Sequence, residues 1–133
     1  MKGISAKLTR GLNIGSFVLA SDNSGARIVR IVGVKKGKTR KGRQQYAKIG
    51  DWVKVSVRKG NLEMVGEVFD AVVIRQKKPY RRKNGERVAF TDNAVVLLKD
   101  DKGNPKGTQI KGPIAREASE RFPFVTKIAK FVM

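Results

Sequence analysis

Apolar residues recur along this chain in short runs separated by polar turns, a pattern typical of β-strands. The clearest run spans residues 51–58, where apolar and polar side chains alternate with the two-residue period of a half-buried strand. The apolar positions are Val53, Val55 and Val57, and the polar ones are Lys54, Ser56 and Arg58. This segment is therefore predicted to be a strand with one face in a core.

Three further runs predict neighbouring strands. Residues 17–20 and 27–34 lie on either side of five consecutive turn-forming residues, 21–25, and this arrangement indicates a hairpin. Residues 67–74 are mostly apolar and rich in β-branched side chains, so we expect both faces of that strand to be covered.

Two later segments have weaker strand patterns. Residues 88–90 and 94–98 flank the polar triplet 91–93 and are expected to form a further strand pair. Residues 108–114 are expected to add a short strand that is limited by Pro113.

The pattern becomes helical near the C-terminus. Residues 115–121 are good helix formers without a β-branched side chain, and Pro123 should break that helix. A second short helix is predicted from apolar residues at three- and four-residue spacing, which are Val125, Ile128, Ala129 and Val132. Several short strands followed by helical turns predict a mainly β fold, a small closed β-barrel with a short C-terminal helical segment at residues 115–133.

Composition adds a strong positive charge to this barrel. The 133 residues suit one domain with an N-terminal arm at residues 1–14, and 40% of them are hydrophobic. Lysine and arginine number 30 against 11 acidic residues, a formal net charge of +19. Solubility needs only about 2 to 8 net charges in a small domain, so the excess indicates a polyanionic partner. Nucleic acid is the first candidate, and an anionic membrane or another polyanion is the alternative.

Two segments carry fourteen of the thirty basic residues. Residues 35–48, expected to form a loop or hairpin tip, contain seven basic residues and no acid, and residues 75–87 contain seven basic residues and one acid. Both follow apolar strands, so the fold should project them outward, where cations can neutralise phosphates. Asn84-Gly85 in the second segment favours a tight turn because both residues tolerate positive φ. A cationic β-ribbon is therefore predicted there.

Residue types and spacing argue against an enzyme. The chain has no cysteine and no histidine, which removes thiolate ligands, the commonest general base and the commonest metal ligand. Three residues separate Gly33 from Gly37, where a phosphate-binding P-loop requires four, and no helical pattern follows. The aspartates lie mostly in turns or at strand borders, where they bond backbone amides. We expect no catalytic residue, no metal and no cofactor.

Five motifs stand in order along the chain. They are Asp22-Asn23-Ser24-Gly25-Ala26-Arg27, residues 71–78 (AVVIRQKK), Arg81-Arg82 with Asn84-Gly85, Asp92-Asn93-Ala94, and residues 107–117 (GTQIKGPIARE). Together they resemble the universal large-subunit ribosomal protein family L-fourteen, over about residues 14–133. The long arm before Leu12 resembles archaeal members. Thr91 departs from the family, in which an acidic residue is common at that position.

The resemblance implies a closed five-stranded barrel with a projecting β-ribbon that binds large-subunit ribosomal RNA. It also implies a place at the subunit interface, a bridge to small-subunit ribosomal RNA, and contacts with neighbouring large-subunit ribosomal proteins. An anti-association factor is a further implied partner, received by the C-terminal part. The residues expected in protein contacts are Arg116, Glu117, Glu120, Phe122 and Phe124.

The sequence thus predicts a non-enzymatic RNA-binding structural protein of the ribosome, working in the cytoplasm. Lys and Arg side chains should neutralise phosphates, and Tyr46 and Tyr80 should either stack on bases or pack on neighbouring side chains. The cations expected to contact phosphates are Lys35, Lys36, Lys38, Arg40, Lys41, Arg43, Arg75, Lys77, Lys78, Arg81, Arg82 and Lys83. The alternative is a sequence-nonspecific DNA-packaging or architectural protein, which charge and a β-ribbon would serve equally well.

Overall fold

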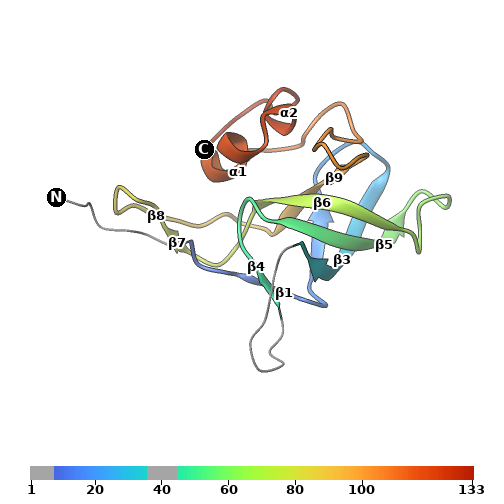
Figure 1. The fold of residues 1–133 in the computed structure, drawn as a ribbon, viewed down its shortest axis with the longest axis horizontal. Coiled ribbons are helices and arrows are strands. Elements are labelled where there is room, and N and C mark those ends of the chain that lie inside the picture. Colours follow the sequence, from blue (N-terminus) through green and yellow to red (C-terminus); the bar gives the residue numbers. More distant parts are fainter. Residues whose placement is uncertain (1–7, 36–44) are drawn as a thin grey trace.

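Five strands form a closed barrel in the computed structural model, which describes residues 8–35 and 45–133. The strands are β2 (Phe17–Ala20), β3 (Ala26–Val34), β5 (Trp52–Gly60), β6 (Val68–Arg75) and β9 (Ala94–Leu98). Neighbours in the order β2-β3-β5-β6-β9 are antiparallel, and a parallel pairing of β2 with β9 closes the barrel (Figure 1). The prediction of a small closed β-barrel is confirmed.

The interior of the barrel is filled by the apolar side of each strand. Val53, Val55 and Val57 of β5 are fully buried, and Val57 lies opposite Val29 of β3, which lies opposite Val18 of β2. Lys54 and Arg58 of β5 are exposed, as the two-residue period predicted, whereas Ser56 is buried on the outer side.

The C-terminal segment covers the outside of β6 and gives that strand two buried faces. It contains α1 (Arg116–Arg121) and α2 (Pro123–Thr126), which lie above β6 in Figure 1. The backbone N–H of Ala115 donates to the Ile74 carbonyl at 3.0 Å, and Ala118 and Val125 are fully buried. From Ala71 onward, both β6 faces are therefore buried, because one meets the barrel interior and the other meets the helices.

The two short helices differ in part from their prediction. The first ends at Arg121, before Pro123, as expected. The second begins at Pro123 itself, because a proline at the first helical position loses no hydrogen bond there. It ends at Thr126, so the periodicity that extended it through Ile128 and Ala129 predicted too long a helix.

The expected strand pair of residues 88–90 and 94–98 is wrong. Val88 belongs to β8 (Arg87–Val88), which pairs with β7 (Tyr80–Arg81) in a separate ribbon, whereas β9 pairs with β6 and β2. The intervening residues do not form a hairpin turn, because Asp92 and Asn93 bind Arg75 and the backbone of Lys77 and direct the chain into the barrel.

The expected strand at residues 108–114 is also wrong. The described structure has only isolated bridges there, Asp22 with Ile110 and Ile114 with Val132. Gly112 has a φ of +80°, outside the strand region, and Pro113 has no N–H to donate. These two residues prevent a regular ladder.

Part of the expected N-terminal arm belongs to the folded body. β1 (Leu12–Asn13) pairs with β4 (Tyr46–Ala47), and both Leu12 and Ala47 are buried. Among the described residues, no helix is long and apolar enough to cross a membrane.

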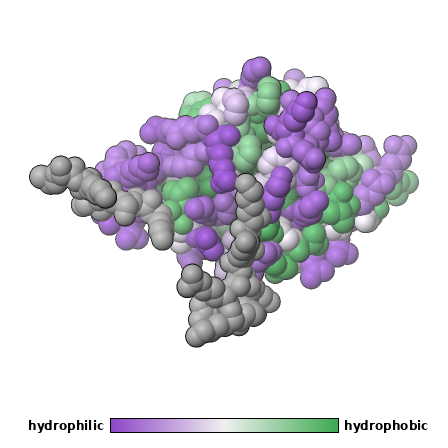
Figure 2. All heavy atoms as spheres, viewed as in Figure 1, coloured by the Kyte–Doolittle hydropathy of each residue, from purple (hydrophilic) through white to green (hydrophobic). Residues whose placement is uncertain are grey.

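The β7–β8 ribbon projects from one end of the barrel, and the β5–β6 turn projects from the other (Figure 1). Figure 2 shows mostly polar residues over the ribbon and more hydrophobic surface toward the β5–β6 end. The fold therefore separates a polar projection from a barrel that keeps apolar side chains at its surface.

Candidate nucleic-acid interface

The ribbon, residues 76–90, is fixed to the barrel at its base. The side-chain N–H of Gln76, a fully buried residue, donates to the carbonyls of Thr9 at 2.9 Å and Lys78 at 3.0 Å. The Lys77 N–H donates to Asn93 Oδ1 at 2.7 Å, and the Phe90 N–H donates to the Gln76 carbonyl at 3.1 Å. These bonds hold both edges of the ribbon where they leave the barrel.

The tip of the ribbon is a hydrogen-bonded turn. The Arg82 N–H donates to the Glu86 carbonyl at 2.8 Å, and the Gly85 N–H donates to the Arg82 carbonyl at 3.0 Å. Gly85 has a φ of +93°, as the Asn84-Gly85 pair predicted, and Asn84 Oδ1 accepts the Glu86 N–H at 3.0 Å. The turn therefore fixes the backbone from which the neighbouring side chains project.

Side chains on the ribbon differ sharply in exposure. Five cations are exposed, and none of them forms an ion pair within the described part of the chain. These five are Lys77, Lys78, Arg81, Lys83 and Arg87. We call these five residues the exposed cation set of the ribbon. Glu86 is the single acid among residues 76–90.

Arg75, expected to contact phosphates, is instead buried where β6 ends. Its Nε pairs with Asp92 Oδ1 at 3.0 Å, and its Nη2 donates to Ser21 Oγ. Its Nη1 donates to the carbonyls of Lys111 at 3.1 Å and Pro113 at 3.3 Å. Burial lowers the pKa of Arg75, an effect that the Asp92 charge opposes. Arg75 thus ties β6 to three other segments of the chain.

Arg82 and Tyr80, also expected at the RNA surface, join the ribbon to the C-terminal segment. Arg82 Nε pairs with Glu117 Oε1 at 2.8 Å, and its Nη2 donates to the Met133 carbonyl at 2.6 Å. The Tyr80 hydroxyl donates to Glu117 Oε2 at 2.9 Å and accepts from Arg82 Nη2 at 3.3 Å. Tyr80, Arg82 and Glu117 form a network that we call the ribbon–helix clamp.

Burial and charge act in opposite directions within this clamp. Burial raises the pKa of Tyr80 to about 12, with Arg82 opposing and Glu117 assisting that shift. Burial alone would lower the pKa of Arg82, but the Tyr80 hydroxyl and the Glu117 carboxylate raise it above its ordinary value. At neutral pH the clamp therefore holds a neutral phenol between a cation and an anion.

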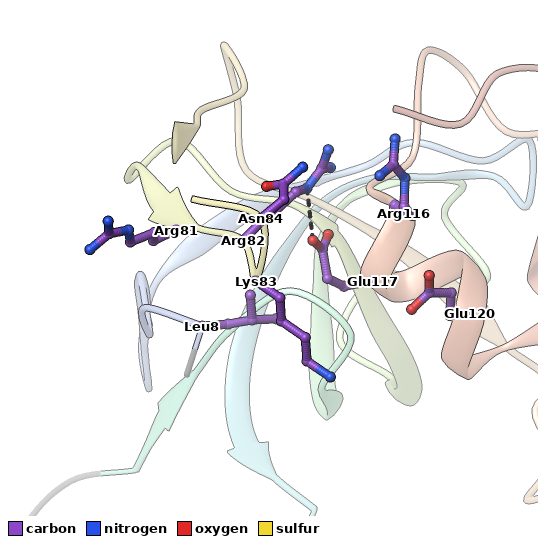
Figure 3. Close-up of a pocket in the computed structure, with 8 residues that line it drawn as sticks. All are labelled: Leu8, Arg81, Arg82, Lys83, Asn84, Arg116, Glu117 and Glu120. Atoms are coloured by element: carbon purple, nitrogen blue, oxygen red, sulfur yellow. Dashed lines mark hydrogen bonds and ion pairs between the residues drawn. The ribbon is translucent and has the colours of Figure 1, made fainter. Parts of the chain in front are cut away.

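A groove of about 390 Å³ lies between the ribbon and α1 (Figure 3). Its ribbon side carries Arg81, Arg82 and Lys83, and the α1 side carries Arg116 and Glu120 beside Glu117. In Figure 3, Arg82 points toward Glu117, while the side chain of Arg81 points away from it. The clamp forms the boundary of the groove and leaves the neighbouring cations free.

The five residues expected in protein contacts are divided by the structure. Arg116 and Glu120 are exposed on α1, whereas Glu117 is held by the clamp. Phe122 is partly buried against Trp52, with ring centroids 6.1 Å apart, and Phe124 is exposed near Lys127. Arg116, Glu120 and Phe124 are thus the members of this set that remain available to a partner.

Most of the first basic segment lies outside the described residues. This applies to Lys36, Lys38, Arg40, Lys41 and Arg43. Lys35 is described, and its Nζ lies 4.2 Å from the centroid of the Trp52 ring. Tyr46 is exposed in β4, so it can stack on a partner, whereas Tyr80 is buried and cannot.

Sequence reasoning overlooked polar and aromatic residues on the outer face of the barrel. Arg30, Arg58 and Lys59 are exposed cations of β3 and β5, and Phe17 of β2 is exposed next to Arg30. The exposure of Phe17 could have been predicted from the alternation of side chains in a strand. Because Val18 is buried, its neighbour Phe17 must lie on the opposite, outer face. Among the described residues, no cluster of acids suits a metal ion.

Comparisons with known proteins identify a single family. Residues 11–133 match the model of a family described as ribosomal protein L14p/L23e. The large ribosomal subunit protein uL14 of Nanoarchaeum equitans is 52% identical over 133 residues, the whole of both chains. The uL14 proteins of Methanothrix thermoacetophila and Halobacterium salinarum are 50% and 47% identical, also over the full length of both chains.

Proposed function

This chain belongs to the ribosomal protein L14p/L23e family, and we propose that it binds large-subunit ribosomal RNA through exposed cations around a rigid barrel. It is a structural constituent of the large ribosomal subunit and not an enzyme, and it belongs to the ribosome in the cytoplasm. A DNA-packaging role would need the same charge, but the family match over residues 11–133 favours the ribosome.

The observation that supports RNA binding is the exposed cation set of the ribbon. Its five cations have no acidic partner in the described chain, and the ribbon that carries them is hydrogen-bonded at its base and its tip. Because the backbone beneath these cations is already ordered, less of the binding energy is lost to ordering when they meet phosphates. Counterion release from the RNA then supplies affinity.

Buried members of the predicted interface take a different part in this mechanism. Arg75 and Arg82 each bind several internal partners, and Tyr80 is buried. A phosphate could reach either guanidinium only after an internal ion pair had been broken, which is costly in a buried site. We therefore assign RNA contact to Lys77, Lys78, Arg81 and Lys83, and positioning of the ribbon to the buried three.

Other surfaces are assigned to the remaining partners. The basic segment at residues 35–48 is proposed to contact RNA as well, because it contains seven cations and no acidic residue. These contacts are proposed to include small-subunit RNA in an intersubunit bridge. The C-terminal segment is proposed to meet a neighbouring ribosomal protein and an anti-association factor. Arg116, Glu120 and Phe124 support this, since they combine both charges with an exposed ring.

Charge reversal at the ribbon tests the RNA proposal. The variant Arg81→Glu with Lys83→Glu should bind a transcript of large-subunit ribosomal RNA at least about 10-fold more weakly, since each residue loses a phosphate contact. The slope of log K against log salt concentration should fall by about 1 to 2. The thermal unfolding midpoint should not fall, because both side chains are exposed.

A matched control reverses two exposed lysines elsewhere. Lys99→Glu with Lys102→Glu changes the net charge equally, but Asp100 and Asp101 already offset these lysines. This control should retain most of the affinity. Unchanged binding by the ribbon variant would contradict the proposal, and equal affinity for duplex DNA and ribosomal RNA at moderate salt would favour the DNA-packaging alternative.

A further inference from the structure

The outer face of β2 displays an aromatic ring that the fold does not use. Phe17 is 63% exposed, although it lies in a strand whose neighbour Val18 is buried. Within the described chain, its ring takes part in no ring–ring or cation–π contact. Leu19 is also exposed on this face. Large exposed apolar groups that gather at one place commonly mark a binding surface.

Cations adjoin the ring on the same face of the sheet. Arg30 of β3 lies directly opposite Phe17 in the antiparallel register, and it is exposed. Arg30 in turn lies opposite Ser56 of β5, which lies opposite Val68 of β6. This row contains a ring, a guanidinium and a small hydroxyl, and it has no acidic residue.

A shallow groove of about 270 Å³ begins at Phe17 and reaches the base of the ribbon. Its lining residues include Phe17, Leu19, Lys77, Thr91 and Asn93. The groove is smaller than the about 300–1,000 Å³ of sites for drug-sized ligands, so it suits one planar group. Lys77 belongs both to this groove and to the exposed cation set of the ribbon, which makes the two surfaces continuous.

The wall of the groove is fixed and carries polar groups. Asn93 accepts the Lys77 N–H at 2.7 Å through its side chain, and its carbonyl accepts the Leu19 N–H at 3.0 Å. Asp92 also lines the groove, but its carboxylate is paired with Arg75 at 3.0 Å. Lys77 in the groove and Arg30 opposite Phe17 therefore set the sign of the local charge, and that sign suits a phosphate backbone.

We propose that the groove beside Phe17 binds one unpaired nucleotide of RNA, with its base stacked on the Phe17 ring. The inference rests on the proposed RNA binding and deepens it. Arg30 and Lys77 would hold the flanking phosphates, while Thr91 and Asn93 line the wall that faces the edge of the base. An aromatic ring that accepts a splayed-out base between cations is a common mode of single-strand RNA recognition.

Binding to a transcript of large-subunit ribosomal RNA tests this site with the full-length protein. Phe17→Leu keeps an apolar side chain but removes the ring, and it should weaken binding about 5-fold or more. The slope of affinity against salt should stay unchanged, because no charge is lost. Phe17→Tyr keeps the ring and should bind within about twofold of the wild type. Ultraviolet irradiation of the wild-type complex should cross-link one nucleotide to the peptide that contains Phe17.

Val68→Ala is the matched control. Val68 lies in the same row, is 57% exposed and has no ring, so this variant should bind like the wild type. Wild-type affinity in Phe17→Leu, combined with weak binding by Arg81→Glu with Lys83→Glu, would overturn the nucleotide site and leave RNA binding by the ribbon intact. Wild-type affinity in both variants would overturn the proposed function as well. A Phe17→Leu defect seen only when other ribosomal proteins are present would identify a protein contact instead and overturn the inference.

Discussion

Two adjacent arginines on the ribbon have different roles because one is exposed and the other is buried. Arg81 is exposed, whereas Arg82 is buried and bonds to Glu117, Tyr80 and the Met133 carbonyl. Successive side chains of an extended segment point to opposite sides, so one of the two faces solvent and the other faces α1. Substitutions at these neighbours should therefore affect different properties.

Arg82→Ala should lower the free energy of unfolding by about 1–3 kcal/mol, because it leaves the partly buried Glu117 without its cation. Arg81→Ala should change it by no more than about 0.5 kcal/mol. Chemical denaturation of the two variants measures both values. Equal effects in the two variants would show that the clamp does not stabilise the fold.

The pKa of Tyr80 gives the protein a dependence on alkaline pH. Its folded pKa of about 12 lies above the ordinary tyrosine pKa of 10.0, so the unfolded chain loses this proton first as pH rises. Stability from Tyr80 is complete below pH 10.0 and should be lost progressively as pH rises toward about 12. Denaturation at several alkaline pH values measures this loss, and the variant Tyr80→Phe should lack that part of it.

An absorbance titration of Tyr46→Phe offers an independent check. Tyr80 is then the single tyrosine, since the chain contains two. Its ionisation should appear near pH 12. Ionisation of Tyr80 near pH 10 in the folded protein would mean that the phenol is not buried in the clamp.

At the scale of elements, the barrel depends on how closely β3 and β5 approach at one end. Gly60, with a φ of +153°, lies opposite Ala26, and a Cβ added to Gly60 would lie 2.6 Å from the Gly25 carbonyl oxygen. It would also lie 2.9 Å from the Ala26 Cα. Both contacts are with backbone, so they cannot be relieved by rotating a side chain.

Gly60→Ala should therefore lower the free energy of unfolding by about 2 kcal/mol or more. Gly33→Ala is the control in the partner strand, because a Cβ there would meet no atom within 4 Å. The control should stay within about 0.5 kcal/mol of the wild type. A small effect at Gly60, measured by thermal or chemical denaturation, would show that β3 and β5 can separate without breaking the barrel.

Two further elements, the ribbon and the C-terminal segment, behave as a coupled pair. The clamp joins them across 35 positions of sequence between Arg82 and Glu117. A partner that displaced α1 would break the clamp and release the ribbon. Conversely, RNA that binds the ribbon only in its clamped position should favour the docked position of α1, because coupling between two sites is reciprocal.

At the scale of the whole molecule, the formal net charge of +19 opposes compaction. The four ion pairs found in the described residues involve Lys54, Arg75, Arg82 and Arg121, so most of the described cations form no ion pair. Repulsion among these exposed cations is screened by salt and removed by a polyanion.

The thermal unfolding midpoint of the isolated protein should therefore rise as the KCl concentration is raised from about 0.05 M to 0.5 M, over which the Debye length shortens severalfold. Addition of ribosomal RNA at low salt should raise it further. A midpoint that falls with added salt would mean that favourable ion pairs, rather than repulsion, dominate the surface.

Much of the fold could be predicted from the amino-acid sequence, because the features concerned are local. The two-residue period fixed the inward side of β5, and the turn at Gly85 required a residue that tolerates positive φ. Pairing between distant strands is not a local property. For that reason the sequence joined residues 88–90 to residues 94–98, whereas the fold pairs β9 with β6 and β2.

The candidate site was divided in the same way. The runs of basic residues predicted a cationic ribbon. A sequence shows where lysines and arginines cluster, but it does not distinguish exposed cations from buried ones. The folded structure was needed to show that Arg75 and Arg82 serve the fold, because their partners lie on segments far away in the chain. It also placed Phe17 beside Arg30 on one exposed face, since strand register brings together residues that the sequence keeps apart.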